Sequence, residues 1–223
     1  MKYLFVVAHP DDEILGAGAT LRKLADQGHD VAVAVMCAHA AARKDLSPTL
    51  SDDEAKAMSL VGVARTFSAD FPNIKMNTVP HLDLVQFIEQ SITAWQADAI
   101  VTHHPSDVNI DHQETSRAAQ AAARLFQRTS GVPPLRFFAY MEVPSCTEWS
   151  LDIPAKRFQP NLFIEIGPVG VDLKIQALSA YAGVMRPYPH PRSPEALRGL
   201  AAFRGAQAGC DYAEAFQTAF SRL

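Results

Sequence analysis

Short, uninterrupted apolar runs alternate with amphipathic segments along the first two-thirds of the chain, and this alternation is the strongest constraint on its fold. Runs at 3–8, 31–37 and 99–102 predict strands buried on both faces, as in a parallel sheet. Helices are predicted at 13–27, 51–60 (opened by a capping-box sequence at 51–54), 82–95 and 112–128, with a short strand at 65–68. The alternation predicts an α/β fold: a Rossmann-like, doubly wound, mostly parallel sheet with helices on both faces.

The last third of the chain is less regular. Strands are predicted at 136–143 and 162–166, and helices at 171–180, 194–207 and 212–222. Residues 186–193 contain three prolines, which favour an extended segment. The 223 residues include no linker-like stretch, so we expect one domain, 1–223. In it, a regular core (1–128) is followed by an irregular C-terminal extension of the same domain (129–223).

Composition excludes several classes of protein. The 20 basic and 24 acidic residues give a net charge of −4, which does not favour binding to nucleic acid. Cys37, Cys146 and Cys210 are far apart and odd in number, so neither a disulfide scaffold nor a thiolate zinc site is expected. No apolar stretch approaches the ~20 residues that span a bilayer, and the first apolar run is too short for a secretory leader. We therefore expect a cytoplasmic protein without membrane insertion.

A histidine and three acidic residues directly follow the first predicted strand, in the segment AHPDDE (8–13). Strand ends of open α/β sheets meet at a ligand crevice, which makes this an expected position for a site. His9 and Asp12 are close enough to ligate one divalent ion through nitrogen and oxygen, which leaves Asp11 as a general base. The alternative is that Asp11 or Asp12 caps the following helix. The carboxylates would repel a pyrophosphate, so a dinucleotide-binding turn is not expected.

A second polar segment, THHPSDVNIDH (102–112), follows the predicted strand 99–102 and contains three of the eight histidines. One neutral imidazole from it would complete a site with three protein ligands and an open position for water. The alternatives are local packing for His103 and His104 and a helix N-cap role for Asp111. Two such segments at one sheet edge indicate a metal site more strongly than either does alone.

Together, segments 8–13 and 104–112 resemble the zinc-dependent de-N-acetylases of the PIG-L or LmbE-like family, relatives of N-acetylglucosaminyl-phosphatidylinositol de-N-acetylase. The similarity extends over about residues 1–128, and segments at 142–149, 160–163 and 189–193 resemble a bacterial branch associated with polysaccharide sugars. The resemblance implies a hydrolase that removes an N-acetyl group from an amino-sugar substrate with Zn²⁺ as cofactor. By position, His9, Asp12 and His112 match the metal ligands, and Asp11 matches the general base.

One position departs from the family pattern. Many members have a histidine three residues before the last metal ligand, assigned to stabilising the oxyanion or protonating the leaving amine; here it is Asn109. A carboxamide can donate a hydrogen bond to an oxyanion, but it has no proton that titrates near neutral pH. The proton donor is then Asp11 acting in reverse, or a histidine, with His190 the first candidate and His104 the second.

Further polar residues are candidates for substrate contacts. Arg192, in the proline-rich segment, is expected to bind a phosphate or carboxylate unless that segment is a solvated loop. Arg43, in the loop after the second strand, is a substrate contact or an exposed surface charge, and His104 is a further substrate-binding candidate. The remaining candidates are residues that orient the ligand imidazoles (Asp107, Asp111) and a sugar-contacting rim (Glu148, Trp149, Tyr188).

Two rival interpretations stay open. The same metal could serve a phosphoesterase, although one metal with few carboxylates favours water attack on an amide over two-metal phosphoryl chemistry. The chain could also be a non-catalytic metal- or sugar-binding protein; Asn109 encourages this, whereas binding alone would not need Asp11 as a base beside the metal. The expected partner is a small N-acetylated molecule. The apolar helix faces can pack against the C-terminal third or against a second copy in a homo-oligomer.

Overall fold

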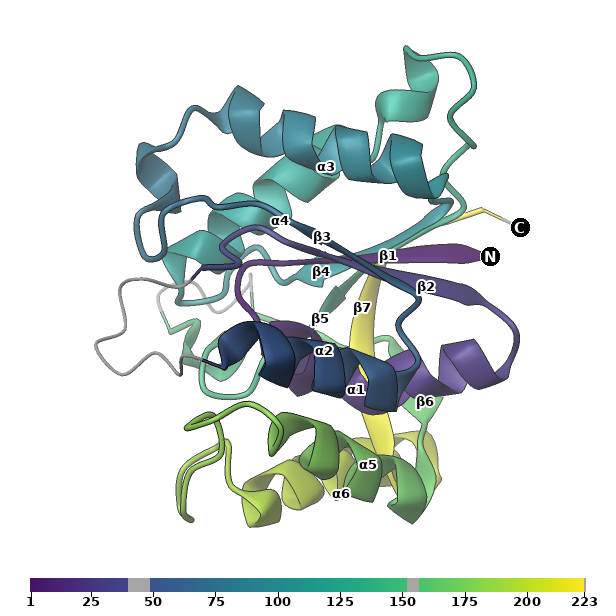
Figure 1. Ribbon diagram of the computed structural model, residues 1–223. Coiled ribbons are helices and arrows are strands. Elements are labelled where there is room, and N and C mark those ends of the chain that lie inside the picture. Colours follow the sequence, from purple (N-terminus) through teal and green to yellow (C-terminus); the bar gives the residue numbers. More distant parts are fainter. Residues whose placement is uncertain (40–48, 152–156, 223) are drawn as a thin grey trace.

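A seven-stranded sheet organises the computed structural model, which describes residues 1–39, 49–151 and 157–222 (Figure 1). The strand order is β3-β2-β1-β4-β5-β7-β6. Strands β1 to β5 are mutually parallel, and β7 runs antiparallel to both β5 and β6. The predicted doubly wound, mostly parallel sheet is therefore confirmed. The strands are β1 (Lys2–Val7), β2 (Asp30–Val35), β3 (Arg65–Ser68), β4 (Ala99–His103), β5 (Phe137–Met141), β6 (Leu162–Glu165) and β7 (Ala213–Ser221).

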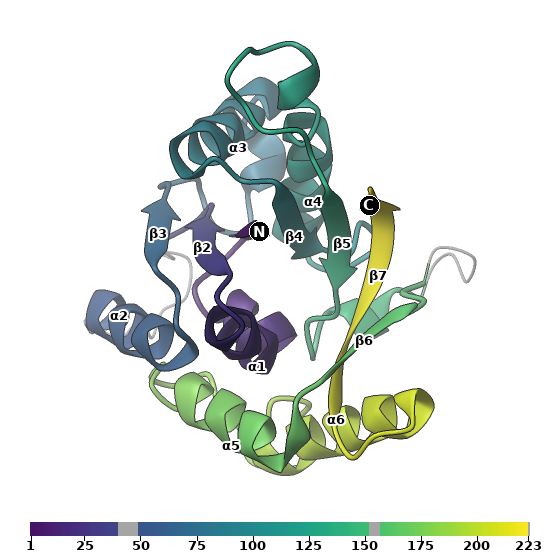
Figure 2. The same ribbon diagram turned by 90° about the vertical axis from the view of Figure 1, so that its right-hand side faces the viewer.

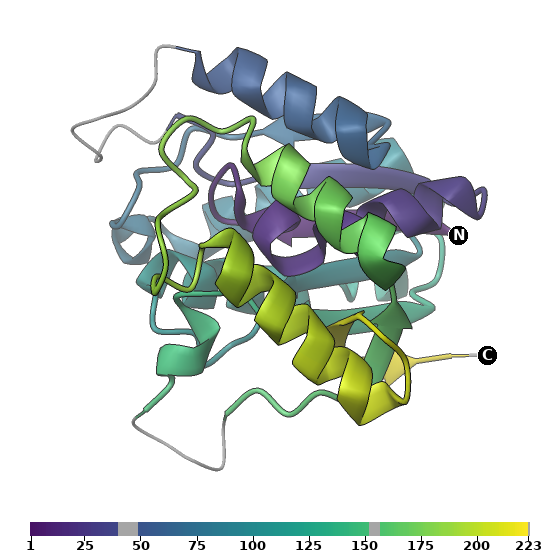
Figure 3. The same ribbon diagram turned by 90° about the horizontal axis from the view of Figure 1, so that it is seen from below.

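Helices cover both faces of this sheet (Figures 1 and 2). Helices α3 and α4 lie on one face and α1 and α2 on the other; α5 packs against α1 and α2, and α6 against β7 (Figure 3). Among the described residues, every helix is too short or too polar to cross a bilayer. The helices are α1 (Asp12–Asp26), α2 (Leu50–Val61), α3 (His81–Trp95), α4 (Ile110–Ala122), α5 (Gly167–Leu178) and α6 (Pro194–Ala208), with short 3₁₀ turns η1 (Met76–Thr78), η2 (Leu125–Gln127) and η3 (Thr147–Trp149).

Alternating side chains of the central strands enter two separate cores, as the two-residue period of a strand requires. One core lies between the sheet and α1, the other between the sheet and helices α3 and α4. From β1 and β2, Phe5, Val7, Val33 and Val35 enter the first, and Leu4, Val6, Ala32 and Ala34 the second. Burial on both faces explains why these strands are continuous apolar runs in the sequence.

The predicted final helix at 212–222 was wrong, because this segment is strand β7. It fills the gap between β5 and β6, and its backbone pairs with both. Its small residues suit either structure locally, so the distant strand partners decide the conformation. The predicted helix 112–128 also ends early, at Ala122.

The predicted capping box at Ser51 was also wrong. Helix α2 begins at Leu50, after Thr49 as N-cap, so Ser51 already lies in the first turn of the helix. Asp53 accepts a hydrogen bond from the backbone N of Ala182 (3.1 Å), which ties α2 to the segment after α5.

Helix α1, which begins at the polar segment after β1, is broken in its middle and held there by the C-terminal third. The break lies at Ala17, whose backbone angles (φ −149°, ψ 19°) are not helical. Beyond the break, Glu214 of β7 accepts hydrogen bonds from the backbone N of Ala19 (3.3 Å) and of Thr20 (2.7 Å). The buried ammonium of Lys174 lies 2.7 Å from the same carboxylate. Glu214 thus caps the second half of α1, since an interrupted helix leaves N–H groups without partners.

Candidate metal centre

Two loops meet where β1 and β4 end. These strands are parallel neighbours in the sheet, so the segment after β1 and the segment after β4 open at the same edge. His9 follows β1, Asp12 is the first residue of α1, and His112 lies in the first turn of α4. All three side chains are buried.

The Asp12 carboxylate lies between two imidazoles. Its Oδ2 atom is 3.2 Å from His9 Nδ1 and 3.3 Å from His112 Nε2. Potential ligand atoms of the three residues all lie within 4.8 Å of one another. Two imidazole nitrogens and one carboxylate oxygen form a donor set that suits a borderline divalent ion such as zinc and leaves further coordination positions open. The structure therefore brings together the three residues for which the sequence predicts metal ligation.

Two further carboxylates face the outer nitrogens of these imidazoles. Asp111 Oδ2 lies 3.0 Å from His9 Nε2, and Asp107 Oδ2 lies 3.1 Å from His112 Nδ1. With each outer nitrogen facing a carboxylate, His9 Nδ1 and His112 Nε2 are the atoms directed at Asp12. This is the arrangement expected for residues that orient metal-binding histidines.

Backbone and hydroxyl groups hold both orienting carboxylates in place. Asp111 accepts hydrogen bonds from the backbone N of Ile74 (2.5 Å) and of Met76 (3.0 Å). Asp107 accepts from the backbone N of Asn109 (2.9 Å) and from Thr147 Oγ1 (2.8 Å). The fixed carboxylates in turn fix the planes of the imidazoles that they face.

Asn109, not Asp111, is the N-cap of α4. Its Oδ1 atom accepts a hydrogen bond from the backbone N of Asp111 (2.9 Å). The alternative role of Asp111 as helix cap is therefore wrong. Because the oxygen of the Asn109 carboxamide is used by the helix, its NH₂ group is the end left to act as a hydrogen-bond donor.

Neighbouring charges set the protonation states of His9, Asp12 and His112. Burial lowers the pKa of His112, but the carboxylates of Asp12 and Asp107 outweigh this and raise it well above its ordinary value. Burial likewise lowers the pKa of His9, and its contacts with Asp111 and Asp12 reverse the effect, so that its pKa is raised. Burial raises the pKa of Asp12, and His112 overrides this and lowers it well below the ordinary value. Without a metal ion, protons therefore supply the positive charge that the buried carboxylates require.

His103, for which the sequence suggested no role, belongs to the same cluster. It is fully buried, and its Nε2 accepts a hydrogen bond from the backbone N of Ala8 (2.8 Å). Its ring stacks on that of His112, with centroids 3.9 Å apart and planes at 18°. Burial and the neighbouring His112 lower the pKa of His103 to about 3, so it is neutral. Its one signal in the sequence was its place at the end of a buried strand.

Asp11 has a strained backbone and a cationic partner. Its φ of 105° is in the left-handed region, which costs about 1–3 kcal/mol for a residue other than glycine and is concentrated at functional sites. Its Oδ2 atom accepts a hydrogen bond from Arg192 Nη1 (3.1 Å), and Arg192 Nε donates to Ser145 Oγ (2.9 Å). Arg192 was predicted to contact the substrate, which stays a prediction; in the structure two of its nitrogens are bonded to protein oxygens.

Glu13 and Tyr181 support the Asp11 turn from the other side. The backbone N of Asp11 donates to Glu13 Oε2 (3.2 Å), and the Tyr181 hydroxyl donates to Glu13 Oε1 (2.8 Å). Tyr181 follows α5, as Arg192 precedes α6. Residues of the C-terminal third therefore hold the Asp11 turn on two sides.

The other predicted site residues lie in different surroundings. Arg43 is outside the described residues. His190 is exposed, and its Nδ1 accepts a hydrogen bond from the backbone N of Arg192 (3.0 Å). His104 is buried, and burial lowers its pKa. Of the predicted rim, Trp149 lines the cavity described next, Glu148 accepts a hydrogen bond from the backbone N of Ser145 (2.7 Å), and Tyr188 is exposed.

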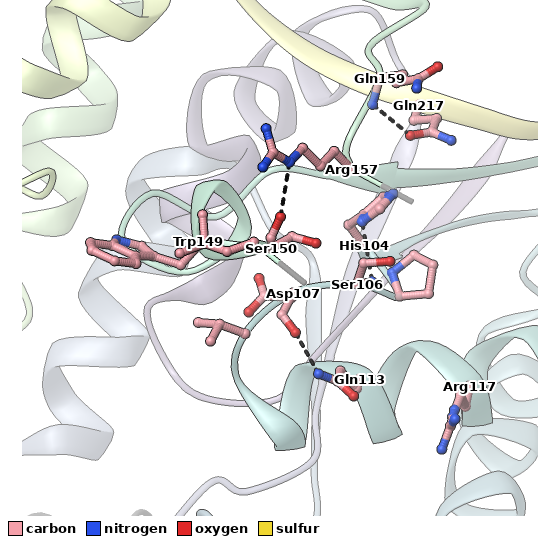
Figure 4. A pocket seen from close by; sticks show the side chains of 13 residues that line it. His104, Ser106, Asp107, Gln113, Arg117, Trp149, Ser150, Arg157, Gln159 and Gln217 are labelled. Carbon is pink, nitrogen blue, oxygen red and sulfur yellow. Dashed lines mark hydrogen bonds between the residues drawn. The ribbon is translucent and has the colours of Figure 1, made fainter. Parts of the chain in front are cut away.

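A cavity of about 690 Å³ lies beside the cluster, next to Asp107 (Figure 4). Residues after β4, on α4, at the end of η3 and beyond it, and on β7 line the cavity, His104 and Trp149 among them. Asp107 both lines this cavity and faces His112, so a single side chain separates the cavity from a predicted metal ligand.

Comparison with known proteins identifies the family to which this α/β chain belongs. The family model of GlcNAc-PI de-N-acetylase, PIG-L, matches residues 4–123, more than half of the chain. The chain belongs to this family. A comparison with the curated proteins gave no match.

Several solved structures share the fold. N,N'-diacetylchitobiose deacetylase from Pyrococcus horikoshii is 20% identical, with a TM-score of 0.77 over 97% of this chain and 83% of that chain. GalB, the 4-carboxy-2-hydroxymuconate hydratase from Pseudomonas putida KT2440, is 21% identical, with a TM-score of 0.75 over 100% and 98%. The zinc-inhibited form of teicoplanin deacetylase Orf2 is 18% identical, with a TM-score of 0.70 over 98% and 97%. Proteins of this fold thus include deacetylases and a hydratase.

Metal-free protein is expected to lose stability as the pH rises above 6.5. The unfolded chain releases the proton of His112 near the ordinary imidazole pKa of 6.5, whereas the folded protein holds it to a higher pH. The stabilisation from this proton is complete below 6.5 and is lost as the pH rises through the raised pKa. Urea unfolding of chelator-treated protein from pH 6.5 to pH 9.0 measures the decline in the free energy of unfolding. The range stops at 9.0, the ordinary pKa of a thiol, so that titration of the cysteines does not contribute.

The matched background for this measurement is Glu13→Gln, because burial raises the pKa of Glu13 well above its ordinary value and its titration acts in the same direction. The slope that remains in Glu13→Gln includes the contribution of the imidazoles, which replacement of His112 isolates. His112→Gln in that background should reduce it, and bound zinc should abolish it. A free energy of unfolding that stays flat or rises over this range would contradict the electrostatic account.

Proposed function

We propose that this protein is a cytoplasmic, zinc-dependent hydrolase that removes the N-acetyl group from an amino-sugar substrate. The observation that carries the proposal is the convergence of His9, Asp12 and His112 beside Asp11, a carboxylate in a strained turn. Membership of the de-N-acetylase family supports the reaction type. The three cysteines, none of them in a disulfide, agree with a reducing compartment.

In this proposal, His9, Asp12 and His112 would hold the zinc ion. When bound there, the ion would supply Lewis acidity for the amide carbonyl and for a water molecule. Asp11, the neighbour of Asp12 in sequence, accepts the proton of the attacking water. Asp107 and Asp111 keep the two imidazoles oriented, and His103 supports His112 by stacking on its ring.

Asn109 and a proton donor complete the proposed reaction. The NH₂ group of Asn109 donates a hydrogen bond to the developing oxyanion, while its oxygen caps α4. The leaving amine takes its proton from Asp11, which has just received one, or from His190. Arg43 and His104 are proposed contacts of the substrate.

Arg192 has a different proposed role from the one that the sequence suggested. Its side chain is only 11% exposed and joins Asp11 to Ser145, in the segment after β5. A guanidinium with this geometry directs one carboxylate oxygen of Asp11 and holds the turn in its strained conformation. Arg192 is therefore a positioning residue for the base.

Two alternative functions, and the similarity of this fold to a hydratase, decide which product the assay must measure. A phosphoesterase would release phosphate from a phosphorylated sugar, and a binding protein would release nothing. Because GalB, one of the similar structures, is a hydratase, the assay should measure acetate itself. Acetate release from N-acetylated sugars and nucleotide sugars supports the proposal, and phosphate release without acetate contradicts it.

Replacement of Asp11 tests the base directly. Asp11→Asn should retain about one zinc per chain while kcat for acetate release falls by about 10²–10⁴-fold, the usual contribution of a general base. Metal analysis and a steady-state assay measure the two effects. Asp172→Asn, an exposed carboxylate on α5, is the control. An unchanged rate would remove Asp11 as base, and loss of zinc would make it a ligand instead.

Arg192 variants separate positioning from substrate binding. If Arg192 positions Asp11, Arg192→Ala should lower kcat by up to about a hundredfold with little change in KM, because a misplaced base slows the chemical step. Arg192→Lys should keep part of the activity, and millimolar guanidinium should partly rescue Arg192→Ala. A raised KM with unchanged kcat would show instead that Arg192 binds the substrate.

A further inference from the structure

One short turn after β5 reaches the proposed base through an arginine. The turn, residues 143–148, runs from just beyond β5 into η3. In it, Ser145 Oγ accepts a hydrogen bond from Arg192 Nε (2.9 Å), and Arg192 Nη1 donates to Asp11 Oδ2 (3.1 Å). Both donors belong to one planar guanidinium, so the place of Ser145 sets the direction from which Arg192 meets the carboxylate.

The same turn reaches a proposed metal ligand through a second carboxylate. Thr147 Oγ1 donates to Asp107 Oδ2 (2.8 Å), and this Oδ2 atom lies 3.1 Å from His112 Nδ1. The oxygen of the Thr147 hydroxyl also accepts a hydrogen bond from the backbone N of Val143 (2.8 Å). Because a hydroxyl has one proton and an ionised carboxylate can only accept, that proton is directed at Asp107.

Hydrogen bonds within the turn hold its two hydroxyls at a fixed spacing. The backbone N atoms of Cys146 (3.1 Å) and Thr147 (3.0 Å) donate to the backbone O of Val143. The backbone N of Ser145 donates to Glu148 Oε1 (2.7 Å). Ser145 has a φ of 78°, a left-handed conformation that a residue other than glycine keeps only where its surroundings impose it. Ser145 and Thr147 therefore belong to one rigid unit.

The proposed reaction depends on the geometry that this unit controls. Asp11 follows β1 and His112 lies on α4, so the two side chains come from different segments of the chain. A base must lie within hydrogen-bond distance of the water whose proton it accepts. A displacement of about 1 Å can slow a reaction by about 10²-fold. A rigid unit bonded toward both side chains keeps their separation constant.

We propose that Ser145 and Thr147 are positioning residues that act together. Ser145 works through Arg192 on the carboxylate of Asp11, and Thr147 works through Asp107 on the imidazole of His112. The turn between them sets the distance from the base to the metal site. This inference rests on the proposed function, which assigns Asp11 as base and His112 as ligand.

Single variants test the two arms of the turn. At saturating zinc, Ser145→Ala should lower kcat for acetate release about tenfold with KM and zinc affinity unchanged, because only the base moves. Thr147→Val should lower zinc affinity, measured by competition with a chromophoric chelator, about tenfold and kcat at saturating zinc by a similar factor. Thr147→Ser keeps the hydroxyl and should restore both. Ser179→Ala, which removes an exposed hydroxyl on the last turn of α5, is the matched control.

The double variant tests whether the two arms act together. Once either hydroxyl is lost, the turn no longer fixes the distance, so the second loss has little left to remove. Ser145→Ala combined with Thr147→Val should therefore lower kcat by little more than either change alone. Independent roles would instead multiply to about a hundredfold. Ser145→Gly, which suits the positive φ and also lacks the hydroxyl, should behave as Ser145→Ala does and replaces it if the alanine variant does not fold.

Three results would overturn the inference. They are a raised KM with unchanged kcat in Ser145→Ala, unchanged zinc affinity in Thr147→Val, and a multiplicative loss of kcat in the double variant. Acetate release by the wild-type protein reports on the proposed function separately. If the wild type releases acetate and the variants match the Ser179→Ala control, only the role of the turn fails. If the wild type releases none, the proposed function fails, and the zinc affinity of Thr147→Val decides whether the turn positions His112.

Discussion

The structure depends on one buried carboxylate placed among imidazoles. Asp12 contacts His9 and His112, and its Oδ2 lies 3.6 Å from His103 Nε2. These side chains come from segments about a hundred residues apart, and they meet because β1 and β4 are parallel neighbours. A buried carboxylate without positive charge beside it is very costly. Protons on the imidazoles or a metal cation supply that charge. The pairing of β1 with β4 brings this ionic centre together, and the proposed chemistry takes place at it.

The C-terminal third contributes the restraints around this centre. Arg192 and the Glu13–Tyr181 pair hold the turn at Asp11, and Glu214 caps the second half of α1. These contacts give a physical reason for the antiparallel strand β7, which brings Glu214 against α1. In the proposed function, the first half of the chain supplies the metal ligands and the last third keeps the base in a conformation that it would not adopt alone.

Whether a feature could be predicted from the sequence depends on how far apart in the sequence its interacting residues are. Strands β1, β2 and β4 were predictable, because burial on both faces leaves a local apolar run, and the grouping of His9 with Asp12 was local as well. The place of His112 needed the family resemblance. Strand β7, the stacking of His103 on His112 and the pairing of Arg192 with Asp11 all depend on partners distant in sequence, and no local pattern announces them.

The most direct test is the position of a bound metal ion. A crystal of zinc-loaded protein, measured on both sides of the zinc absorption edge, locates the ion by its anomalous scattering. The account predicts one zinc ion between His9 Nδ1, Asp12 Oδ2 and His112 Nε2. Within the part of the chain that the structure describes, two other groupings of potential ligands occur, His103–Asp107–His112 and His9–Cys37–Asp111. A zinc ion in either of those, or none in the Asp12 cluster, would contradict the account.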